Sequence, residues 1–419
     1  MLLAKHLPIV MKRAEKLISL LIAMCFDPNN GRVVHYGRHI LASWRIIVKR
    51  LLKLLLLLPL SAAAQQADLT RTAGPCSNVW GTDKDGEIRL FGVHGSIDTR
   101  VDAFRCTDPA VQRNARATVA LLRRGRDFDE SNVALSDTES VAGTLNNLVT
   151  FHTVSHGSRQ RQVFPAQGAS AIPRTACRSE RFREQNSYAS CSGVLISPTT
   201  VLTAAHCIEG VNPRDLLVVM DLAYEAGRAP PLNMPTSDDR LRRITWVAAT
   251  KSAANQDMAL LHLAGEPVRN RALGWPTTNE TIRDGQSVYA LGHPDGLPLK
   301  LAPGGRVSRT SNVIEFATDL PIFHGNSGGP IFDTASHRLL GIVRSGPSDW
   351  YYRTQGPDAE DRDCATSLCA YAPEAFKASC NAPELANRLT MTPPWLRMLS
   401  LDDSGSLQNQ DKEVGRSIP

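Results

Sequence analysis

Short apolar runs separated by turn residues fill the chain from residue 162 to residue 401. Gly, Pro, Asn and Asp lie between the runs, which are short for helices and are not linked by helical periodicity. The runs are Ser192–Ile196, Val201–Ala204, Leu216–Leu222, Ile244–Ala248, Met258–Leu263, Val288–Leu291, Val313–Ala317, Pro330–Phe332 and Leu339–Val343. Many short strands at this spacing predict an all-β barrel or sandwich.

The flanking segments show a different pattern. Residues 65–161 contain one strand candidate, Ile88–Val93, and one helix candidate, Pro109–Arg123, before a polar stretch, so we expect an N-terminal accessory region or propeptide there. Near the other end, a Thr-Pro-Pro-Trp segment predicts the start of a C-terminal helix. We therefore expect the β domain to span residues 162–402 and residues 403–419 to form a polar tail.

The first 64 residues differ from the rest in charge. They carry a net charge of +8, whereas the remainder of the chain is at −2, which gives no electrostatic reason to expect a nucleic-acid partner. Basic residues precede the apolar stretch Leu54–Leu60 and the small-residue pair Ala62 and Ala64, which is the pattern of a signal peptide. This stretch is about half as long as a membrane span needs. We expect a secreted or periplasmic protein without a stable span in its mature form, with a short anchor as the alternative.

The cysteines indicate disulfides. Removal of the leader leaves eight of them, at positions 76, 106, 177, 191, 207, 364, 369 and 380. An even number behind an export signal favours disulfides, and no His follows at zinc-finger spacing, so we expect no metal site and no cofactor. Cys191 and Cys207 flank a predicted hairpin and should bond to each other. Cys76 and Cys106 could pair within the N-terminal region, and the pairing of the other cysteines stays open.

Three segments carry residues that suit covalent catalysis. CSGVLISPTTVLTAAHC contains His206, NQDMALLHL opens a strand with Asp257, and HGNSGGPIF holds Ser327 among glycines. A serine hydroxyl needs a base at neutral pH, and an imidazole can serve if a carboxylate fixes its tautomer. We expect Ser327 to be the nucleophile, His206 the general base and then acid, and Asp257 the residue that orients it. The amides of Gly325 and Ser327 would form an oxyanion hole.

These motifs resemble, in the same chain order, the His, Asp and Ser motifs of the chymotrypsin-fold (trypsin-like) serine proteases. The segment LGHPDGLPLKLAPGGRV and Asn326, where animal members usually have Asp, are similar to the bacterial V8-like and HtrA-like branch. The resemblance implies two six-stranded antiparallel barrels with the active site in the cleft between them. With the predicted helix and N-terminal extension, this is the expected architecture.

Other positions depart from the family's pattern. No Ile-Val-Gly-Gly segment precedes Cys191, so activation by a new N-terminus is not expected. Pro321 stands where trypsins have an Asp, which gives no support for a preference for Lys or Arg. The V8 branch has a His in the strand where this chain has Val343 or Arg344, so glutamyl preference is not supported either.

Three residues are candidates for substrate binding. Arg344 stands where animal enzymes have a Ser that supports the catalytic Asp and binds the substrate main chain, Gly346 follows it, and His324 precedes the oxyanion loop. Arg159-Gln160-Arg161 is either an activation cut or, as we favour, a basic surface loop.

The sequence thus predicts an exported serine endopeptidase that acts on proteins or peptides through an acyl-enzyme. A catalytically silent binding module on the same fold is the alternative, and Arg344 is the only feature that favours it. An HtrA-type protease with an added peptide-binding domain is disfavoured by the length left after Gly346. The sequence does not indicate an oligomeric state.

Overall fold

The computed structural model describes residues 100–133, 146–251, 256–275, 281–310, 312–354, 361–367, 372–376, 378, 382–389 and 396. Within this part, no helix has the length and apolar character needed to span a bilayer. The predicted leader, the strand candidate Ile88–Val93 and the polar tail lie outside the described residues. Of the predicted C-terminal helix only Leu396 is described, and it is helical and fully buried.

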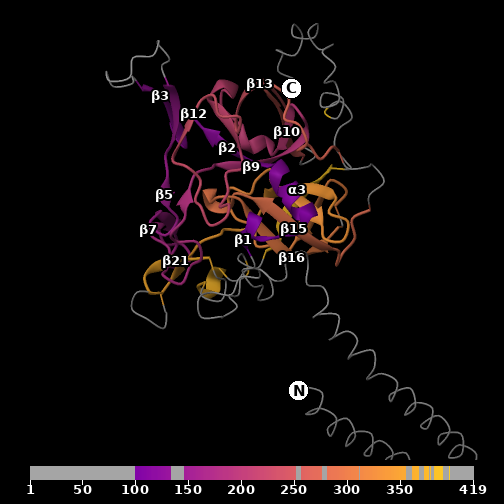
Figure 1. The fold of residues 1–419 in the computed structure, drawn as a ribbon. Coiled ribbons are helices and arrows are strands. Elements are labelled where there is room, and N and C mark those ends of the chain that lie inside the picture. Colours follow the sequence, from indigo (N-terminus) through magenta and orange to yellow (C-terminus); the bar gives the residue numbers. More distant parts are fainter. Residues whose placement is uncertain are drawn as a thin grey trace, which may run out of the picture. The chain divides into compact units, whose positions relative to one another are not determined.

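Six antiparallel strands close the first barrel in the order β10-β14-β13-β11-β2-β9. Figure 1 labels four of them, β2, β9, β10 and β13. The strands are β2 (Thr118–Arg123), β9 (Cys191–Ser197), β10 (Thr200–Thr203), β11 (Leu216–Met220), β13 (Leu241–Lys251) and β14 (Asp257–Leu263). Val119, Leu195 and Val201 belong to one buried cluster inside it. Closure pairs both edges of every strand, which leaves no open sheet edge.

Six further strands form the second barrel. They are β15 (Ser287–Gly292), β16 (Lys300–Arg309), β17 (Glu315–Thr318), β18 (Pro330–Asp333), β19 (Leu339–Ser345) and β22 (Glu384–Arg388). They follow the order β16-β15-β18-β19-β22-β17, and the pairing of β17 with β16 closes the ring. The short strand β1 (Val101–Asp102) adds to β16 from outside. The predicted pair of six-stranded antiparallel barrels is confirmed, and the nine predicted strands all lie in it.

The helix predicted over Pro109–Arg123 is wrong in its second half. Helix α3 spans Pro109–Ala117, begins with the side chain of Asp108 accepting two amide hydrogen bonds, and ends where β2 begins. The first five residues of β2 are buried, and β2 pairs on both sides, with β9 and β11. A short apolar run that is buried and paired on both sides forms a strand, although the spacing of its apolar residues is also compatible with a helix.

Strand β2 also shows where the first barrel starts. It lies inside residues 65–161, so the barrel takes one of its strands from the segment that the sequence pattern separated from the β domain. Residue 162 is therefore not the beginning of the barrel. Helix α3 joins the two halves, because it continues into β2 while Val111 and Ala115 pack in a cluster with Leu291 of the second barrel.

A segment of residues 124–190, here called the insertion, separates β2 from β9. It holds β3 (Phe128–Val133), β4 (Asn146–Phe151), β5 (Val154–Ser155), β6 (Arg161–Val163), β7 (Ile172–Arg174) and β8 (Asn186–Ser187). β12 (Asn233–Pro235) pairs with β4, while β5 pairs with β8 and β6 with β7. A disulfide from Cys177 to Cys364 ties the insertion to the hairpin of β20 (Tyr351–Arg353) and β21 (Cys364–Thr366).

The remaining described elements are short 3-10 turns. They are η3 (Ala103–Arg105), η4 (Ala205–Cys207), η5 (Pro213–Asp215), η6 (Pro294–Gly296) and η9 (Glu374–Phe376). Two of them, η4 and η6, lie at the candidate active site.

Candidate active site

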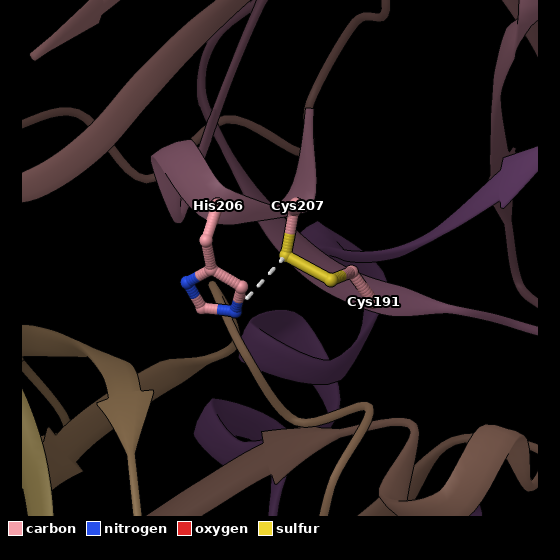
Figure 2. Close-up of side chains that lie close together, drawn as sticks. All are labelled: Cys191, His206 and Cys207. Carbon is pink, nitrogen blue, oxygen red and sulfur yellow. Dashed lines mark hydrogen bonds between the residues drawn. A yellow bond between two sulfur atoms is a disulfide. The ribbon is translucent and has the colours of Figure 1, made fainter. Parts of the chain in front are cut away.

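His206 lies in η4, the turn that follows β10. β9 and β10 pair antiparallel and bring Cys191 and Cys207 together, and the predicted disulfide between them is present. Figure 2 shows the bridge beside the imidazole, with Cys207 Sγ 3.9 Å from His206 Nε2. A disulfide sulfur has no proton to donate, so we interpret this as a packing contact that holds the turn in place.

Asp257 is the first residue of β14 and makes two contacts with His206. Its Oδ2 lies 2.6 Å from His206 Nδ1, and its Oδ1 accepts a hydrogen bond of 2.9 Å from the main-chain N–H of His206. The carboxylate therefore holds both the ring and its turn, and it favours the tautomer with the proton on Nδ1. Burial works to raise the pKa of Asp257, but the hydrogen bonds and charge of His206 outweigh it, so that pKa lies below its usual value.

Asn387 holds the main chain of Asp257 from the other barrel. This fully buried residue of β22 donates from Nδ2 to the Asp257 carbonyl at 2.8 Å and accepts from the Asp257 N–H at 3.4 Å. Sequence reasoning missed it, because ELANR is a polar segment without an apolar run and no motif marks it. Its role is visible only once the two barrels are folded together.

The loop from Gly325 to Gly329 packs against the turn that carries His206. A Cβ on Gly328, which has φ of 79°, would overlap Thr203 and the main chain of Ser192 and Ala204, so only glycine fits there. Ser192 N–H donates to the Ser327 carbonyl at 2.9 Å. Among the described residues, the Ser327 hydroxyl makes no hydrogen bond to His206. Contacts between a nucleophile and its base often shorten only when substrate binds.

Two amides of this loop point away from the protein's own acceptors. Among the described residues, neither the Gly325 N–H nor the Ser327 N–H donates to any acceptor, whereas Asn326 N–H donates to the Phe323 carbonyl. Gly325 has φ of 94°, and a Cβ on it would overlap the His293 carbonyl. Unpaired amides on both sides of one residue are what an oxyanion hole needs.

Residues of η6 hold the peptide between His324 and Gly325. Asp295 N–H donates to the His324 carbonyl, so that carbonyl faces η6 and leaves the Gly325 amide on the other side. The Asp295 carboxylate accepts from Arg161 Nη2 at 2.6 Å, and its carbonyl accepts from Arg159 Nη1 at 2.8 Å. The insertion therefore contacts the candidate oxyanion loop through η6.

The surroundings of Arg161 fit neither of the two interpretations of the Arg159-Gln160-Arg161 segment. Its side chain is 5% exposed and its guanidinium lies 3.7 Å from the ring centroid of Trp350. It is therefore neither an exposed surface residue nor an accessible cut site in this fold.

The three candidate substrate-binding residues differ in their surroundings. Arg344 forms an ion pair of 2.5 Å with Glu315, and its charge also helps to lower the pKa of Asp257. His324 is exposed, and its N–H donates to Asp349 Oδ2 at 2.6 Å. Gly346 is exposed, and a Cβ on it would overlap the Glu384 carboxylate.

Two side-chain clusters have the donor types of a metal site. One is Cys191, His206 and Cys207, and the other is Cys177, Asp361 and Cys364. In each cluster the two sulfurs are bonded to each other, so neither is a thiolate that could bind a metal. Sequence reasoning left the pair Cys177 and Cys364 open, since spacing alone does not define connectivity. Cys106 is also disulfide-bonded, while Cys76, Cys369 and Cys380 lie outside the described residues.

Comparison with known families places this site in context. Residues 191–342, which include His206, Asp257 and Ser327, match the family model of the trypsin-like peptidase domain. This part of the chain is similar to that family, in agreement with the resemblance seen in the motifs.

Individual relatives match over shorter stretches. A probable periplasmic serine endoprotease, DegP-like, from Pseudomonas fluorescens is 36% identical over 92 residues, which are 20% of this chain and 18% of that protein. A protein of the same description from Pseudomonas savastanoi pv. phaseolicola is 29% identical over 177 residues, covering 41% of this chain and 31% of that one. This chain thus matches less than a third of either relative's length.

Solved structures with a detectable likeness include human heparin binding protein and a serine endoprotease from Yersinia pestis. The first is 17% identical with a TM-score of 0.35, over 51% of this chain and 87% of that one. The second is 18% identical with a TM-score of 0.33, over 57% of this chain and 56% of that one.

Proposed function

We propose that this protein is an exported serine endopeptidase that cleaves peptide bonds through an acyl-enzyme. The observation that carries the proposal is the 2.6 Å contact of His206 Nδ1 with Asp257, beside a glycine-rich loop whose Gly325 and Ser327 amides are unpaired. The match of residues 191–342 to the trypsin-like peptidase domain supports the same chemistry.

In the proposed reaction, His206 Nε2 takes the proton of the Ser327 hydroxyl while its oxygen attacks the substrate carbonyl carbon. Asp257 keeps the Nδ1 proton in place and stabilises the imidazolium. The carbonyl electron pair moves to oxygen, where the Gly325 and Ser327 amides bind it. Collapse expels the amine, which takes the proton from His206, and water then repeats the sequence to release the acid and restore Ser327.

Export is proposed from three observations. The leader has the pattern of a signal peptide, the relatives from Pseudomonas are described as periplasmic, and the chain contains disulfides. Disulfides form and persist in oxidising compartments such as the periplasm or the extracellular medium.

Replacement of Ser327 tests the catalytic assignment. We expect the wild-type protein to react with a fluorophosphonate probe and to hydrolyse an unstructured protein such as casein, and Ser327→Ala to do neither, because the attacking oxygen is gone. Ser308→Ala removes a hydroxyl from an exposed position on β16 and should keep both activities. Hydrolysis by Ser327→Ala would contradict the assignment.

The binding-module alternative gives the opposite result in the same experiment. If the protein is a silent binding module, the folded wild-type protein should not react with the fluorophosphonate probe under any condition. Arg344 is the residue that favoured this alternative. Its side chain is paired with Glu315, and among the described residues it forms no hydrogen bond to His206.

A further inference from the structure

A buried carboxylate lies at one side of the candidate active site. Glu384, the first residue of β22, is 7% exposed, and among the described residues it has neither a hydrogen-bond donor nor a cation as a partner. It lies against the exposed Gly346, where a Cβ would overlap the carboxylate. The carboxyl group of Glu384 is thus directed at the candidate substrate-binding residue Gly346.

A comparison within the chain shows how unusual this is. Glu180 is equally buried at 7% exposure, but its oxygens accept hydrogen bonds from Thr366 Oγ1 at 2.7 Å, Ser367 N–H at 2.9 Å and Ser367 Oγ at 2.5 Å. A buried carboxylate normally has such partners, because desolvation without them is costly. Glu384 lacks them, so a structural role does not account for it.

Strand pairing places Glu384 within reach of the serine loop. Gly328 N–H donates to the Val343 carbonyl, and Val343 pairs with Ala386 on β22. Glu384 precedes Ala386 by two residues and so faces the same side of the strand. Two strand spacings and two residues along β22 separate Glu384 from the loop, on the order of 10 Å.

A second acidic side chain adds to the negative potential there. Asp349 Oδ2 accepts from the His324 N–H at 2.6 Å, and burial raises the pKa of Asp349 to about 7. Burial first, and then the charge of Asp349, also raise the pKa of Glu384 well above its usual value. A cation placed beside Glu384 would offset both effects and stabilise the charged form of its carboxylate.

We propose that Glu384 is a specificity-determining residue and binds the cationic side chain, lysine or arginine, of the substrate residue whose carbonyl Ser327 attacks. The inference rests on the proposed function and names its substrate class. Pro321 gave no reason to expect basic preference, because the family's usual acidic position is apolar here. The acid instead comes from β22, a strand that the sequence pattern did not reveal.

The test measures kcat/KM for matched peptides that differ only at that residue. Lysine is compared with norleucine, and arginine with citrulline, which keep the length of each side chain but remove its charge. We expect the charged member of each pair to be preferred by about 10- to 100-fold, which is the strength of a hydrogen bond to a charged group. In Glu384→Gln the preference should fall to within a few-fold.

Glu266→Gln is the matched control, because it makes the same chemical change at an exposed position after β14 and should keep the preference. Each variant is first labelled with fluorophosphonate, which reports the proposed active site independently of specificity. Normal labelling with equal rates on lysine and norleucine in the wild-type protein would overturn this inference and leave the proposed function standing. Absence of labelling in the wild-type protein would overturn the proposed function itself.

If Glu384→Gln does not fold, the wild-type rates alone decide. A ratio near one for both the lysine and arginine pairs contradicts the inference, and a high ratio for either pair supports it. The pair with the higher ratio shows which of the two cations the site prefers.

Discussion

His293 is a buried histidine of the candidate site that does not take part in the proposed chemistry. It is 1% exposed, its Nδ1 lies 3.0 Å from the Leu297 carbonyl, and its main-chain N–H donates to Ser192 Oγ at 2.9 Å. The ring is therefore a neutral donor that fixes the start of η6. Burial lowers the pKa of His293 to about 4.

That shift makes stability depend on pH. In the unfolded chain a histidine binds a proton near pH 6.5, whereas folded His293 does so only near pH 4. The contribution of His293 to the free energy of unfolding is therefore complete above about pH 6.5. It is lost as the pH falls toward 4, and the total loss is on the order of 3 kcal/mol. Between about pH 7.5 and pH 5, we expect the free energy of unfolding of the wild-type protein to fall by about 2 kcal/mol more than that of His293→Gln.

Denaturant unfolding of both proteins at the two pH values measures this difference. All other titrating groups, Asp349 among them, are common to both chains and cancel. Parallel stability curves for the two proteins would show that His293 does not titrate as described.

At the scale of elements, η6 connects the insertion with the candidate oxyanion loop. Arg161 donates a hydrogen bond to the Asp295 carboxylate, and the Asp295 N–H donates to the His324 carbonyl. Because that carbonyl faces η6, the Gly325 amide faces the other side. Arg161 is a positioning residue in this arrangement and does not touch a substrate. Its removal should therefore affect stabilisation of the transition state more than binding of the substrate.

We expect Arg161→Gln to lower kcat about tenfold with little change in KM, a fraction of the loss seen when an oxyanion donor is removed altogether. Arg214→Gln, at an exposed position in η5, is the control. Steady-state kinetics on one good peptide substrate separates kcat from KM. An unchanged kcat in Arg161→Gln, or an equal loss in Arg214→Gln, would show that this contact does not position the oxyanion loop.

The elements also show what a single sequence can predict. Strands with continuous apolar runs, such as β14 and β19, were found because burial on both faces requires such residues. β16 was missed because KLAPGGRVSR contains Pro and two Gly at a bulge, and β22 because ELANR is largely polar. His206 and Asp257 were found from local motifs, whereas Asn387 and Glu384 depend on how β22 pairs with distant strands.

At the scale of the whole molecule, the first barrel depends on residues far upstream of its motifs. Val119, Leu121 and Leu122 of β2 are at most 2% exposed, and burial of each such side chain contributes about 1.5–3 kcal/mol. Their sum approaches the total stability of an ordinary domain, about 5–15 kcal/mol. Loss of β2 would also leave β9 and β11 with open edges.

We therefore expect a chain that begins at Gln162 not to fold, although it contains all three catalytic motifs. A chain that begins at Ala73, where the larger compact unit starts, should fold and react with fluorophosphonate. Circular dichroism and thermal unfolding of the two chains measure the difference. Cooperative unfolding together with probe labelling of the shorter chain would show that β2 is dispensable.

The disulfide between Cys177 and Cys364 affects what happens when another protease cuts this chain. Its two ends are 187 residues apart, and the whole stretch from His206 to Ser327 lies between them. A single nick in any surface loop of that stretch leaves both fragments covalently joined, so the nicked molecule stays in one piece until a reductant opens the bridge. Damage of this kind would be seen as a smaller band only on a reducing gel.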